Sequence, residues 1–212
     1  MQINYKLENE KLIKNMNKSF EDIYLYFEKI DFKTDDEYKR LNNTYYKLVA
    51  MHYGSFLIQL HYNKFSSAIV LSRTILEVSI KSFYCEFIEK AKNRKIKNIL
   101  SQEYKFSEML EQLDEYKDKS SAGFNGFFSQ FSKKSLATYQ QLSLFTHGKG
   151  EYLEAFYEHG SLSFTSKQIY EILNMMYKLF LNLSIFRLFV YGYFDEVKYL
   201  ITKYEFDLRD EE

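Results

Sequence analysis

Apolar residues recur every three or four positions along most of this chain, the spacing that gathers them on one face of an α-helix. The first such segment, 7–30, carries them at Leu12, Met16, Phe20, Ile23, Tyr24 and Phe27. The same spacing predicts further helices over 35–62, from after Asn63 to about 88, and over 107–117, 127–146, 166–193 and 195–204. The chain has no proline, and its first glycine is Gly54. Because proline costs about 3 kcal/mol and glycine about 1 kcal/mol inside a helix, we expect an all-α fold.

The expected architecture is a single domain, residues 1–212, built as a bundle of five to seven helices. A chain of this length supports one sizeable core and does not require two. The third and the penultimate helices are apolar around much of their circumference, so we place them at the centre. Loops are predicted at 119–126 and 148–164, and a frayed acidic tail at 207–212. Thr34 and Glu37 have the spacing of a capping box that would start the second helix, and Asn63 is expected to end it.

The charges of the chain balance, with 29 Lys and Arg residues against 29 Asp and Glu residues. No overall field therefore draws the protein to nucleic acid or to an anionic membrane, and any contact with nucleic acid must be local. One basic run follows the third helix, and it consists of Lys90, Lys92, Arg94, Lys95 and Lys97. Two interpretations stay open: cations that complement the dipole at a helix end, or a patch that contacts phosphate.

Three features favour a cytoplasmic protein that does not enter a membrane. The single cysteine, Cys85, excludes an internal disulfide and lies in an apolar helix, where a free thiol behaves as a small hydrophobe. The N-terminus has no apolar stretch of the kind found in signal peptides. The most apolar late segment, 179–194, is interrupted by Asn182 and Arg187 and is shorter than the ~20 residues that span a bilayer. We expect a core helix there.

Two charged residues, Arg73 and Glu77, interrupt the apolar third helix. They lie four positions apart and therefore share one helical face. Their neighbours on that face are suited to a core, and they are Ile69, Leu76, Ile80 and Tyr84. A charge is rarely kept in such surroundings unless it is paired and hydrogen-bonded. Arg73 and Glu77 are therefore either an internal structural pair or part of a polar site.

The chain carries no strong catalytic or cofactor motif. It lacks a glycine-rich phosphate loop and the patterns His-Glu-x-x-His, Cys-x-x-Cys and Gly-x-Ser-x-Gly. None of its four histidines has the Glu-x-x-His spacing of a di-metal carboxylate bundle; they are His52, His61, His147 and His159. We expect neither a metal ion nor a cofactor.

His147 differs from the other histidines because it stands at the predicted end of a helix, directly before Gly148. Ser143 lies four positions earlier on the same face, and Gln140 lies one turn further back. One interpretation is structural, since a histidine in the last turn contacts terminal carbonyls and gains from the helix dipole when protonated. The other is a polar pocket in which Gln140, Ser143, His147 and Lys149 join Arg73 and Glu77. There the imidazole would transfer protons and the arginine would hold a phosphate.

The patterns Arg73-x-x-x-Glu77 and Ser143-x-x-x-His147-Gly148 resemble those of a group of uncharacterised bacterial helical-bundle proteins. These are similar to the HEPN superfamily, which includes toxin ribonucleases, abortive-infection proteins and CRISPR-associated nucleases. HEPN ribonucleases generally have an arginine separated from the histidine by four to six residues, with both groups near a dimer interface. This chain has Gln141 and Gln140 at two of those positions. The resemblance therefore implies catalysis by His147 with Arg73 as the substitute arginine.

Two functional hypotheses follow. The first is a HEPN-like protein of bacterial conflict and phage defence that cleaves RNA without a metal. Its catalytic group would comprise His147, Arg73, Glu77 and Ser143, with Gln140 and Lys149 contacting substrate. The second is a non-catalytic interaction module in which Arg73, Glu77 and His147 form a buried structural network. In either case we expect a homodimer, with RNA or another protein as the partner.

Overall fold

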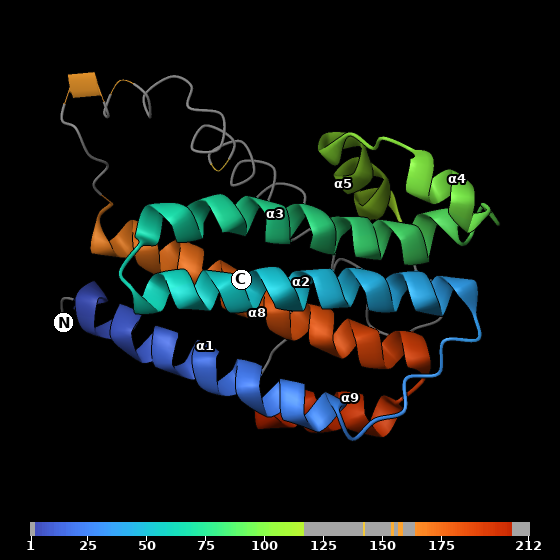
Figure 1. The fold of residues 1–212 in the computed structure, drawn as a ribbon, viewed down its shortest axis with the longest axis horizontal. Coiled ribbons are helices and arrows are strands. Elements are labelled where there is room, and N and C mark those ends of the chain that lie inside the picture. Colours follow the sequence, from blue (N-terminus) through green and yellow to red (C-terminus); the bar gives the residue numbers. More distant parts are fainter. Residues whose placement is uncertain (1–2, 117–141, 143–153, 155–156, 159–163, 205–212) are drawn as a thin grey trace. The chain divides into compact units, whose positions relative to one another are not determined.

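The computed structural model describes residues 3–116, 142, 154, 157–158 and 164–204. All regular secondary structure in these residues is helical, which confirms the prediction of an all-α bundle. The α-helices are α1 (Tyr5–Phe27), α2 (Glu37–His61), α3 (Phe65–Tyr84), α4 (Ile96–Ser101), α5 (Phe106–Glu115), α8 (Ser166–Tyr191) and α9 (Phe194–Lys203), with a π-helical segment at Cys85–Glu89 (Figure 1).

The predicted helices agree with the observed ones to within a few residues at most ends, with two differences. The α-helix α3 ends at Tyr84, and the π-helical segment carries the chain on to Glu89. The short α4 was not predicted, because Ile99 is its only buried residue and leaves no periodic signal. Of the predicted helix 127–146 only Leu142 is described, and it is helical and buried. The predicted loop 119–126 and tail 207–212 lie outside the described residues.

The chain forms two compact units, each assembled from segments distant in sequence. The first comprises Met1–Asp31, Val49–Leu76 and Gln140–Asn182, and the second comprises Phe32–Leu48, Glu77–Tyr139 and Leu183–Glu212.

Within the predicted loop 148–164, the described residues Glu154, Tyr157 and Glu158 are helical.

The core of the first unit is aromatic. The rings of Tyr53 on α2 and Phe180 on α8 stack with centroids 4.4 Å apart. Phe20 on α1 contacts both, at 5.7 Å from Tyr53 and 5.4 Å from Phe180. Gly54 follows Tyr53 on α2, and a Cβ placed there would lie 3.4 Å from the ring of Phe20. One cluster of rings thus joins α1 and α2 to α8, which lies far from them in the sequence.

The core of the second unit joins α3 to the later half of α8. The ring of Phe83 meets the ring of Phe186 edge-on, with centroids 4.7 Å apart. On the next residue of α8, the buried guanidinium of Arg187 lies 3.6 Å from the ring centroid of Phe32 and 4.4 Å from that of Tyr46. A delocalised cation packs well against such ring faces. Arg187 was expected to interrupt an apolar helix, and the structure buries it between aromatic rings.

Several helix ends are set by residues in the left-handed backbone region. Asn63, Asn93 and Gly192 have positive φ angles of 55°, 51° and 78°. Each is followed by a backbone hydrogen bond spanning five residues, from Lys64 to Gln59, Arg94 to Glu89, and Tyr193 to Leu188. This is the Schellman arrangement, which satisfies carbonyls at a helix end. The predicted end at Asn63 is therefore confirmed.

The predicted capping box at the start of α2 is wrong. The carboxylate of Asp36, not the hydroxyl of Thr34, accepts a hydrogen bond from the backbone N–H of Lys39 at 2.8 Å. The carbonyl of Thr34 instead accepts from the guanidinium of Arg40. Asp and Thr are both favourable caps, so local sequence alone did not decide between them.

Among the described helices, α8 is the one long and apolar enough to cross a membrane, with a mean hydropathy of 1.3 over an 18-residue window. Within the molecule 67% of that window is buried, as is usual for a core helix. Core helices of soluble proteins meet the same criterion, so the helix does not by itself show a membrane protein.

Candidate functional site

Arg73 and Glu77, the two described members of the predicted site, are half-buried on α3. The side chain of Glu77 is 32% exposed, and its carboxylate forms an ion pair with Lys81 at 3.0 Å. Neighbouring Leu76 and Ile80 are fully buried. The two charged residues therefore lie at the edge of the apolar face and not within it, which the sequence pattern did not anticipate.

The remaining predicted site residues lie outside the described part of the chain. They are Gln140, Ser143, His147 and Lys149. The convergence of these side chains on Arg73 and Glu77 therefore stays a prediction. Among the described residues, no group of three or more His, Cys, Asp or Glu side chains is arranged to hold a metal ion.

The most unusual polar feature in the described residues is Glu89, a carboxylate only 1% exposed. It ends the π-helical segment Cys85–Glu89, in which the N–H of Lys90 donates to the carbonyl of Cys85 at 3.0 Å. A π turn holds an extra residue and changes the direction of the side chains that follow. Here Glu89 is buried whereas the apolar Ile88 is only half-buried. Single π turns of this kind are frequent at functional sites.

Three side chains surround the Glu89 carboxylate. The hydroxyl of Tyr104 donates to Oε2 at 3.2 Å, and the Nε of Arg94 lies 3.3 Å from the same oxygen. The Nζ of Lys92 lies 3.5 Å from Oε1. We call these four residues the Glu89 centre. A buried carboxylate is tolerated when cations and donors of this kind surround it.

A second set of contacts fixes the backbone around the Glu89 centre. The hydroxyl of Tyr38, on α2, lies within hydrogen-bonding distance of the carbonyls of Glu89 and Arg94, which are five residues apart. On α5, the side-chain oxygen of Gln112 accepts from Lys92 at 3.0 Å and from Tyr84 at 3.1 Å. The turn that carries Lys92 and Arg94 is therefore tied to α2, α3 and α5.

Burial and the charge of Glu89 both raise the pKa of nearby acidic groups. Burial, followed by the charge of Glu89, raises the pKa of Tyr84 to about 12 and also raises the pKa of Tyr104. Burial raises the pKa of the Cys85 thiol to about 11. Both phenols therefore keep their protons as donors at neutral pH, and Cys85 stays a neutral thiol, as its structural interpretation requires.

The Glu89 centre was missed because the apolar periodicity ends at residue 88 and the basic run that follows is typical of a solvated helix end. A signal was present. Glu89 precedes Lys92 by three positions and Glu86 precedes Lys90 by four, spacings that favour helical ion pairs. What the sequence could not indicate was that a π turn would bury Glu89.

No family model matches the chain, and neither a curated protein nor a solved structure is significantly similar to it. The resemblance to HEPN-like proteins therefore depends on the Arg73-x-x-x-Glu77 and Ser143-x-x-x-His147-Gly148 patterns alone. For the first of these patterns, the structure shows that Arg73 and Glu77 both lie on α3.

Proposed function

We propose that this chain is a HEPN-like protein of bacterial conflict and phage defence that cleaves RNA without a metal ion. The observation that best supports a site over a sealed structural network is the partial exposure of Arg73 and Glu77 on α3. The side chain of Arg73 is half-buried, with its Nε shielded from solvent, and an arginine in such surroundings attracts a phosphate more strongly than one in bulk water.

In the proposed reaction, the His147 imidazole removes the proton of an RNA 2′-hydroxyl. The 2′-oxygen attacks the adjacent phosphorus, and the guanidinium of Arg73 stabilises the charge that develops on the phosphorane oxygens. The bond to the 5′-oxygen then breaks, that oxygen takes up a proton from water, and the His147 imidazolium returns its proton to the solvent. The products are a 2′,3′-cyclic phosphate and a 5′-hydroxyl. Glu77 and Ser143 would position these groups, and Gln140 and Lys149 would contact the substrate.

The proposal is tested with purified protein and a 5′-labelled single-stranded RNA in EDTA. We expect cleavage that leaves 2′,3′-cyclic phosphate ends and is lost in His147→Ala and in Arg73→Gln. His61→Ala is the matched control, because His61 is an exposed histidine at the end of α2. Circular dichroism would show whether each variant keeps its helices. RNA that stays intact at high protein concentration would refute the proposed activity.

The alternative, a non-catalytic dimeric module with a buried Arg73, Glu77 and His147 network, makes a different prediction. It requires Arg73→Ala and Glu77→Ala each to destabilise the protein by several kcal/mol, with much of the loss recovered in the double variant. Because the ion pair of Glu77 with Lys81 is about one-third exposed at both ends, we expect a much smaller loss for Glu77→Ala.

A further inference from the structure

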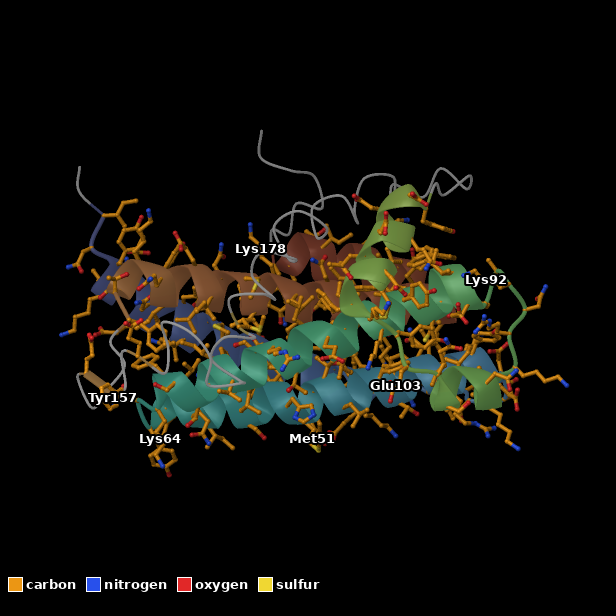
Figure 2. The ribbon with its side chains drawn as sticks, turned by 90° about the horizontal axis from the view of Figure 1, so that it is seen from above. Met51, Lys64, Lys92, Glu103, Tyr157 and Lys178 are labelled. Atoms are coloured by element: carbon orange, nitrogen blue, oxygen red, sulfur yellow. The ribbon has the colours of Figure 1, made fainter. Side chains whose placement is uncertain are left out.

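The turn between α3 and α4 concentrates positive charge. Five of the 29 Lys and Arg residues of the chain lie in residues 90–97, which we call the basic segment. Figure 2 shows Lys92 where the chain leaves the α3 helix. Because the whole chain has no net charge, a polyanion would be attracted only by a local concentration of this kind.

Contacts with Glu89 fix the conformation of the basic segment. The Glu89 carboxylate contacts both Lys92 and Arg94, whose side chains stay 47% and 42% exposed. The N–H of Arg94 donates to the carbonyl of Glu89, and Asn93 takes the left-handed conformation that this closure requires. A preorganised surface loses less conformational entropy when a ligand binds. The buried Glu89 thus orders the cations without covering them.

Two cations in the basic segment have no counter-charge among the described residues. Lys95 and Lys97 are exposed, and neither forms an ion pair within that part of the chain. The carboxylate of Glu86 pairs with Lys90, and that of Glu89 contacts Lys92 and Arg94. The exposed face of the basic segment is therefore net positive.

We propose that the basic segment binds the phosphate backbone of single-stranded RNA, with Lys95 and Lys97 as direct phosphate contacts. The choice of RNA rests on the proposed function. A membrane surface fits less well, because interfacial helices present a long apolar face, and the six-residue α4 exposes one large apolar side chain, Leu100. Contacts to phosphate carry no sequence information, so binding would be independent of sequence.

The test is fluorescence anisotropy of a labelled single-stranded RNA over a salt series, in a His147→Ala background so that the RNA is not consumed. The variant is Lys95→Gln/Lys97→Gln. The matched control is Lys64→Gln/Lys178→Gln, which removes two exposed lysines of the other unit, both labelled in Figure 2. The slope of log K against log salt is negative, and each lost phosphate contact on a single strand reduces its magnitude by ~0.7, so the variant should reduce the magnitude by ~1.4. The control should leave it unchanged.

The outcomes separate this inference from the proposed function. Unchanged salt dependence of binding in the Lys95→Gln/Lys97→Gln variant, with RNA still cleaved when the same variant keeps His147, would overturn the inference and leave the proposed activity standing. Binding that depends on the basic segment without any cleavage by the unmodified protein would uphold the inference and refute the activity. Failure to bind RNA, or binding only to vesicles of anionic phospholipid, would also overturn the inference.

Discussion

Replacing Glu89 with glutamine tests whether the Glu89 centre stabilises the fold. The substitution keeps the size of the side chain and one acceptor oxygen but removes the charge. A hydrogen bond to a charged group contributes about 1.5–3 kcal/mol, against about 0.5–1.5 kcal/mol for a neutral one. The contacts of Tyr104 at 3.2 Å and Arg94 at 3.3 Å should each lose about 1 kcal/mol, whereas Lys92 at 3.5 Å contributes little.

Two effects reduce this loss of about 2 kcal/mol. Glutamine avoids the desolvation cost of a buried carboxylate, and the side chains of Lys92 and Arg94 are nearly half exposed and can rehydrate. We therefore expect Glu89→Gln to lower the free energy of unfolding by about 1–2 kcal/mol. The assay is urea denaturation followed by circular dichroism, which reports a lower midpoint at an unchanged m value.

The matched control is Glu77→Gln, which removes a carboxylate from an ion pair that is about one-third exposed. Such pairs contribute at most about 1 kcal/mol and often much less. If Glu89→Gln costs no more than Glu77→Gln, the reasoning about the Glu89 centre is wrong. A double-mutant cycle with Arg94→Gln should give a coupling energy of about 0.5–1 kcal/mol, because the two residues are in direct contact.

Three further predictions concern the core. Gly54→Ala should raise the free energy of unfolding by up to about 1 kcal/mol, because the added Cβ makes only an ordinary 3.4 Å contact with Phe20; a lower urea midpoint would contradict this. Tyr53→Phe should be neutral or stabilising by about 1 kcal/mol, because the buried hydroxyl has no hydrogen-bond partner among the described residues; a clear loss of thermal stability would indicate a partner. Cys85, with its pKa raised to about 11 by burial, should resist iodoacetamide at pH 8 until the protein is unfolded in urea. Rapid alkylation of the folded protein would refute the burial of this thiol. A neutral buried thiol contributes its full stability below the pKa of the unfolded thiol, so the free energy of unfolding should fall by up to about 1.4 kcal/mol per pH unit between that pKa and about 11.

The helical architecture was predictable because it depends on local, repeated signals. An apolar residue every three or four positions and the lack of proline indicated α1, α2, α3 and α8 to within a few residues. Asn63 was recognisable as a helix end, because asparagine tolerates the left-handed conformation better than most residues. Each of these features is set by residues close together in the sequence.

The polar features were less predictable because they depend on contacts distant in sequence. Arg73 and Glu77 looked buried by their helical neighbours, yet both are half exposed, since exposure depends on what packs against a helix. Glu89 looked like part of a solvated helix end, and its burial requires a π turn and donors from the residues that follow. The cap of α2 came from Asp36 and not from Thr34, a choice between two suitable residues.

The π turn at Cys85–Glu89 also has an evolutionary consequence. A π turn is equivalent to one residue inserted into a regular helix. If the same residues were wound as a regular α-helix, every later side chain would be rotated by about 100° around the axis, which would take Glu89 away from Arg94 and Tyr104. Related sequences that keep the buried carboxylate should therefore have either the π turn or a regular α-helical segment one residue shorter, whereas sequences of the same length without the π turn should lack it.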